Sequence, residues 1–127
     1  MDYQMKQVTS RFHARECKEM GQYILSLLKG NVTKYLTERT RQFWTWGARK
    51  FAIVASTDGC YGLQFHTTGL KHKGRVRVYY NPASDLFDVE FLRPRKDEVV
   101  HHVEDVDLTA LHNVCHRFIE RDDDEEV

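Results

Sequence analysis

The chain has 127 residues, of which 41% are hydrophobic and 30% charged, with 2 prolines, 7 glycines and 3 cysteines. This composition is typical of one small globular domain and excludes collagen-like and low-complexity classes. No apolar run approaches the ~20 residues of a membrane helix, residues 1–11 contain no apolar signal-peptide core, and the cysteines have no paired spacing. We therefore expect a cytoplasmic domain without membrane contact or disulfides.

The net charge of zero hides a strong asymmetry along the chain. Residues 1–82 carry 14 Lys and Arg against 5 Asp and Glu (net +9), whereas residues 83–127 carry 5 against 14 (net −9). Either the two halves neutralise each other across the fold, or the basic half forms a face that meets an acidic partner. Five of the acids form the run 122–126, which is typical of a solvated, disordered tail. We expect one domain over residues 1–121 and an acidic tail over 122–127.

The first predicted element is an amphipathic helix over about residues 12–29. Cys17, Met20, Ile24 and Leu27 recur at steps of three and four residues, and Gly30 supplies the stop. Gly21 inside this helix costs about 1 kcal/mol relative to alanine and would let another element approach closely. Residues 32–40 suit one more helical turn and little else.

After this turn the hydrophobic pattern changes to period two. Residues 51–55 and 61–65 alternate around a turn at 57–59, and residues 75–80 and 87–91 alternate around a turn at 81–85. The register of the second hairpin follows from the acids of its second strand. These acids must stay out of the core, and a slip by one residue would bury them. The predicted partners are Val76 with Phe91, Arg77 with Glu90, and Val78 with Val89.

The chain then predicts a short edge strand at 98–103 and a final helix. Asp105 or Asp107 would cap this helix, whose apolar stripe comprises Leu108, Leu111, Cys115 and Phe118. The fold class is therefore α+β: an N-terminal helix, a four- to five-stranded antiparallel meander and a C-terminal helix, with the helices on one face of the sheet.

Four short motifs occur in order along the chain: Gly47 to Phe51 (GARKF), Gly62 to Phe65 (GLQF), Val76 to Val78 (VRV) and Asp85 to Phe91 (DLFDVEF). This series resembles a loose family of small hypothetical proteins from prophages and mobile elements of gut bacteria, with the pattern G-A-K-N-F, L-x-F, V-x-I and D-x-Y-D-V-E-F. The resemblance spans about residues 43–120. It implies a shared fold and a mobile-element origin, and it implies no mechanism, because the family has no established activity.

The sequence contains none of the nucleotide-binding, hydrolase or metalloprotease motifs. His112 and His116, four residues apart on a helix, could chelate a metal, but a zinc site needs three or four ligands. We expect two partly exposed histidines on a helix flank and no metal, with Cys115 in the core.

Catalytic pairs can be assembled from Cys60 with His66, or from Asp85, Asp88 and Glu90. Nothing in the pattern indicates an activated thiol, and the carboxylates on the strand are explained by cross-strand pairs with arginines. We expect no enzymatic activity and no cofactor.

Aromatic and basic residues form the remaining candidate site. If residues 43–46 are extended, Trp44 and Trp46 share one face, where aromatics beside cations suit base stacking and phosphate contact. The alternative is that both tryptophans belong to the core. The candidate nucleic-acid-binding residues are Trp44, Trp46, Arg49, Lys50, Lys71, Lys73, Arg75 and Arg77.

The sequence favours a non-enzymatic binding or accessory module whose partner is another protein or a second copy of the chain in a homodimer. The alternatives are a nucleic-acid binder that uses the basic and aromatic surface, and a metal-dependent protein that uses the two helix-spaced histidines.

Overall fold

The computed structural model describes residues 11–30, 37–56 and 59–120. The predicted turn residues 57–58, most of the ambiguous segment 32–40 and the acidic tail lie outside the described residues. The helices and strands, in chain order, are α1 (Arg11–Lys29), α2 (Glu38–Thr45), β1 (Arg49–Ala55), β2 (Tyr61–Thr68), β3 (Lys73–Asn81), β4 (Leu86–Leu92), β5 (Val99–Val106) and α3 (Leu111–Ile119).

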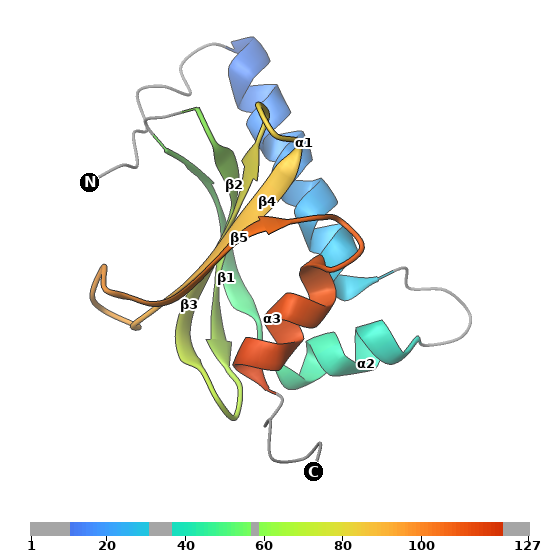
Figure 1. Cartoon of the computed structure of the whole chain (residues 1–127), viewed down its shortest axis with the longest axis vertical. Helices are drawn as coiled ribbons and strands as arrows, with labels where there is room; N and C mark the ends of the chain where they lie inside the picture. Colours follow the sequence, from blue (N-terminus) through green and yellow to red (C-terminus); the bar gives the residue numbers. More distant parts are fainter. Residues whose placement is uncertain (1–10, 31–36, 57–58, 121–127) are drawn as a thin grey trace.

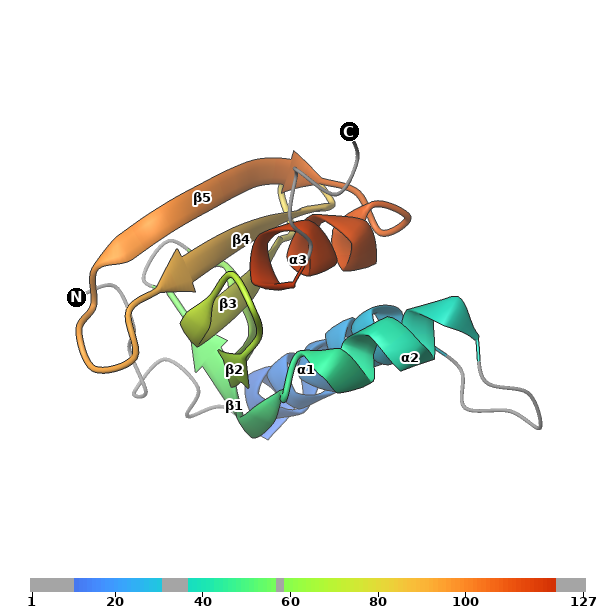
Figure 2. The same ribbon diagram turned by 90° about the horizontal axis from the view of Figure 1, so that it is seen from below.

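The five strands form one antiparallel meander in the order β1-β2-β3-β4-β5. All three helices lie on the same side of this sheet (Figures 1 and 2). The predicted α+β class and the predicted placement of the helices are therefore confirmed. The core fills the space between the sheet and the helices, and no described helix covers the opposite face, which we call the open face.

The predicted register of the β3–β4 hairpin is also confirmed. Val78 lies opposite Val89, and both side chains are fully buried under the helices. Arg77 lies opposite Glu90 on the open face, where both are half-buried. The alternation of apolar and charged residues thus assigns each strand residue to its face.

Helix α1 packs its apolar stripe on β1 and β2. Cys17, Ile24 and Leu28 are fully buried, as their spacing predicts. At Gly21 a Cβ atom would collide with Cδ1 of Ile53, so the absence of a side chain lets the helix approach the edge strand closely.

The alternating aromatics of residues 43–46 suggested an extended segment, but the structure has helix α2 there. Thr37 accepts a hydrogen bond from the backbone N–H of Thr40 (3.2 Å), which caps the helix, and the Thr40 hydroxyl donates to the carbonyl of Lys29 (2.8 Å). Phe43 and Trp46 are three residues apart and point to the same side, into the core. The expectation of an extended segment here is wrong, because helical spacing buries these two rings together.

The start of α3 also differs from the expectation. Asp105 lies within β5 with φ of +59° at a bulge, and Asp107 accepts from the backbone N–H groups of Thr109 and Ala110, both at 2.9 Å. The carboxylate therefore closes a turn before the helix. The hydrogen bond from the Thr109 hydroxyl (2.6 Å), with those from the two N–H groups, lowers the pKa of Asp107 below its ordinary value. Leu108 lies in this turn with 49% of its surface exposed, so it is not part of the apolar stripe.

The two faces of the hairpin predict different responses to a charge. Val78→Asp should abolish folding, because it places an unpaired carboxylate in the core. Glu90→Lys should cost less than about 1 kcal/mol, because the new side chain stays on the open face. Urea denaturation of both variants measures the difference, and equal destabilisation would contradict this assignment of the faces.

Candidate functional site

One end of the sheet gathers basic residues from three separate segments: the start of β1, the β2–β3 turn with the start of β3, and the β4–β5 loop. We call this the basic end. It holds Arg49, Lys50, Lys71, Lys73, Arg75, Arg77, Arg93, Arg95 and Lys96, with the acids Asp97, Glu98 and Glu120. The antiparallel meander places these segments together, because β1, β3 and β5 begin where β2 and β4 end.

The other end of the sheet has the opposite charge. The β3–β4 turn and the adjoining parts of β4 and β5, which we call the acidic end, carry Asp85, Asp88, Glu104, Asp105 and Asp107. No Lys or Arg occurs among the described turn and strand residues there. Along the strands and their described turns, the charges thus form a gradient from the basic end to the acidic end.

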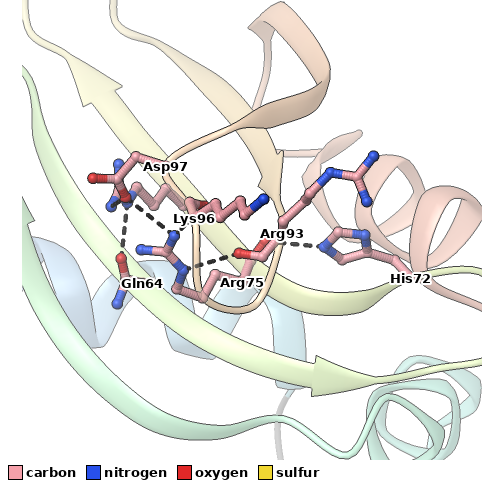
Figure 3. A network of polar contacts seen from close by, with 7 residues as sticks. Gln64, His72, Arg75, Arg93, Lys96 and Asp97 are labelled. Atoms are coloured by element: carbon pink, nitrogen blue, oxygen red, sulfur yellow. Dashed lines mark hydrogen bonds and ion pairs between the residues drawn. The ribbon is translucent and has the colours of Figure 1, made fainter.

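Arg75 attaches the β4–β5 loop to the sheet (Figure 3), and Arg77 makes a further contact with this loop. The guanidinium of Arg75 donates to the carbonyls of Lys96 (2.6 Å) and Arg93 (3.3 Å), and it lies 3.1 Å from a carboxylate oxygen of Asp97. Arg77 lies 3.3 Å from the same oxygen and donates to Gln64 at 2.8 Å. These contacts hold the pKa of Asp97 below its ordinary value, and they fix the loop on the open face.

The side chains of Arg75 and Arg77 are each only 13% exposed. Arg75, a candidate nucleic-acid-binding residue of the sequence, therefore lies largely out of solvent, because its side chain holds the loop through several contacts. Its role in the structure is to fix the loop on which Arg95 and Lys96 are exposed.

The β2–β3 turn is fixed in a different way. The Thr67 hydroxyl donates to the carbonyl of His72 (3.0 Å), and the backbone N–H groups of Lys71 and His72 donate to the carbonyl of Ile119 at the end of α3. His72 is buried with its ring edge-on to Phe91, and burial lowers its pKa. The turn is thus rigid at its base, while the side chains of Lys71 and Lys73 are exposed.

Seven basic residues of this end are exposed, and one of them, Arg93, is paired with Glu98. We call the other six the exposed cations: Arg49, Lys50, Lys71, Lys73, Arg95 and Lys96. Arg49 and Lys73 donate to the nearby backbone carbonyls of Gly47 and Gly69, both at 3.3 Å. Across the described residues, the ion pairs of this end involve Arg75, Arg77 and Arg93, and none involves an exposed cation. The exposed cations are therefore available to an anionic partner.

The two tryptophans are separated. Trp46 is fully buried; its Nε1 donates to Nδ1 of His116 (2.9 Å), and its ring lies 5.2 Å from that of His112. Trp44 lies on α2 with 56% of its surface exposed. The expectation that both share a binding face is wrong, and the core alternative holds for Trp46. The carbonyl of Trp46 accepts from the N–H of Thr68, which places the end of α2 beside the basic end.

His112 is not on an exposed flank, as expected, but inside the core. Its Nδ1 donates to the carbonyl of Leu28 (2.6 Å), and its Nε2 lies 2.8 Å from Oε1 of Gln42. Burial lowers the pKa of His112 to about 4, against the opposing effect of the Leu28 carbonyl. No group of three His, Cys, Asp or Glu side chains suited to a metal occurs among the described residues, and the absence of metal stays a prediction.

The Cys60–His66 pair considered for the sequence does not assemble. Cys60 and His66 lie six positions apart along one strand direction, roughly 20 Å. Cys60 is instead buried beside Val54 and Tyr79. Cys60 and Tyr79 belong to a polar cavity of about 180 Å³ on the open face, lined by Ser56, Cys60, Tyr79, Asp88, Glu90, His102 and Glu104. The carboxylates of Asp88 and Glu90 thus share this cavity, whereas Asp85 does not line it. The absence of catalysis stays a prediction.

Sequence reasoning missed Arg93, Arg95 and Lys96. The signal that could have identified them is their clustering around Pro94, because they are three of the 5 Lys and Arg in the otherwise acidic half. Their neighbours on β3 become apparent only once the strands are paired.

No protein-family model, curated protein or solved structure matches the chain. In the part of the chain that the structure describes, no helix has the length and apolar character needed to cross a membrane.

The buried His112 predicts a loss of stability in mild acid. The pKa of His112 is about 4 in the folded chain and ~6.5 in the unfolded chain. At a pH between these two values, the unfolded chain binds a proton at this residue and the folded chain does not. The free energy of unfolding should therefore fall by about 2 kcal/mol from pH 7 to pH 5 on account of this residue. Urea denaturation across this range measures the change.

His112→Gln should reduce this dependence on pH, because the variant lacks the buried imidazole. A His112→Gln variant with the full wild-type slope would contradict the assignment.

Proposed function

We propose that the protein is a non-enzymatic binding module that contacts the phosphates of a nucleic acid through its basic end. The observation that carries this proposal is the convergence of six exposed cations from three segments on one end of the sheet. Six of the eight residues singled out in the sequence lie at this end. Four of those six are exposed cations, and the other two, Arg75 and Arg77, hold the loop that adds Arg95 and Lys96.

The composition of the surface supports phosphate contact over base recognition. Phosphate contacts by Lys and Arg are independent of sequence and sensitive to salt. Base stacking on single strands needs exposed aromatic rings, and Trp46 is buried, which leaves Trp44 as the exposed tryptophan. We therefore expect a double strand to bind at least as well as a single strand.

A protein partner is the second candidate, and the acidic end favours it. Opposite charges at the two ends of one sheet would let the basic end of one copy meet the acidic end of another. An apolar groove of about 240 Å³ beside the edge strand β1, whose walls include Leu25, Phe51 and Ile53, offers additional contact area. A mobile-element origin and a cytoplasmic location stay predictions.

Charge reversal within the basic end should abolish binding. With Lys71→Glu and Lys73→Glu together, affinity for a labelled 20-base-pair duplex should fall at least tenfold in 50 mM salt. For the wild type, three to five phosphate contacts predict an affinity that falls as roughly the third to fifth power of salt concentration. Fluorescence anisotropy measures both quantities, and the melting temperature confirms that the variant is folded.

The matched control is Arg15→Glu with Lys18→Glu. These two residues are exposed on the N-terminal half of α1, at the end of the molecule opposite the β2–β3 turn (Figure 1). This variant has the same net charge and should keep its affinity within threefold. Equal losses in both variants would reduce the effect to net charge, and no binding by the wild type or a tail-deleted protein at tens of micromolar would exclude the proposal.

A further inference from the structure

The last helix ends against the basic end. The carbonyl of Ile119 accepts from the backbone N–H groups of Lys71 (2.9 Å) and His72 (3.2 Å), and the Glu120 carboxylate accepts from the N–H of Leu70 (3.0 Å). At Gly69 a Cβ atom would collide with Ile119, so the β2–β3 turn and the end of α3 are in direct contact. The chain therefore leaves the described fold at the turn that carries two exposed cations.

The residues that follow have the opposite charge. Five consecutive acids, Asp122 to Glu126, begin two positions after Glu120. Five residues can span up to about 17 Å when extended, which brings Lys71 and Lys73 within their range from this point of exit. The exposed cations form no ion pair within the described part of the chain. They therefore offer these carboxylates a surface of opposite charge.

We propose that the segment 122–126 binds the basic end of its own chain and competes there with the anionic partner. The evidence for the contact is the position at which the chain leaves α3 and the opposite charges of the segment and the basic end. The competition also rests on the proposed function. Each exposed ion pair contributes little by itself, but the attachment to α3 gives the segment an effective concentration in the millimolar range. Salt at physiological concentration screens beyond ~8 Å and weakens the contact.

The contact is tested without nucleic acid. A neutral-tail variant carries Asp122→Asn, Asp123→Asn, Asp124→Asn, Glu125→Gln and Glu126→Gln in the full chain. In 20 mM salt, backbone amide signals of residues 69–73 should shift between wild type and variant, and the difference should vanish in 500 mM salt. Glu16→Gln with Glu19→Gln on α1 is the control and should leave those signals unchanged. Coincident signals of wild type and neutral-tail variant at residues 69–73 would overturn the contact.

The competition is tested with the 20-base-pair duplex. The neutral-tail variant should bind about tenfold more tightly than the wild type in 50 mM salt, and the two affinities should converge in 500 mM salt. Equal affinities in low salt would overturn the competition while leaving the proposed function intact. Amide shifts together with no duplex binding by either protein would support the contact, and would overturn both the nucleic-acid function and the competition that depends on it.

Discussion

The rest of the structure depends on the burial of Trp46 between the sheet and α3. Its indole lies parallel to the ring of Phe65 on β2 at 6.5 Å and donates to His116 on α3, while its carbonyl accepts from Thr68. His112, stacked on the same indole, joins α1 through the Leu28 carbonyl. A single side chain thus connects the three helices with the strands. Arg49, the first residue of β1, follows three positions later.

The charge gradient follows from connectivity rather than from any dedicated element. In an antiparallel meander, turns alternate between the two ends of the sheet, so turns that alternate in charge along the chain separate their charges in space. The β2–β3 turn and the β4–β5 loop carry cations at one end, and the β3–β4 turn between them carries Asp85 at the other. Arg75 holds that loop through the carbonyls of Arg93 and Lys96 and through Asp97, so buried arginines on β3 position exposed cations on the loop.

The sequence was sufficient to predict the elements whose hydrophobic periodicity and strand pairing indicate the same structure. The hairpin register followed from keeping Asp88 and Glu90 out of the core, and α1 followed from its apolar stripe. Prediction failed where tertiary contacts determine the local structure. A short helix with alternating aromatics has the sequence pattern of a strand, and only the burial of Phe43 beside Trp46 identifies α2 as a helix. His112 carries a polar ring whose burial depends on a carbonyl 84 positions away. Those long-range partners leave no local signal.

Stability and binding are separable at the basic end because its arginines and lysines are in different environments. Asp97 already compensates the charges of Arg75 and Arg77, which are largely withdrawn from water, so a polyanion gains little from them. The exposed cations keep their hydration and their counterions, and release of those counterions is what drives association with phosphates. An acidic segment of the same chain would act on the exposed cations alone. It would alter affinity without disturbing the contacts that hold the loop and the sheet together.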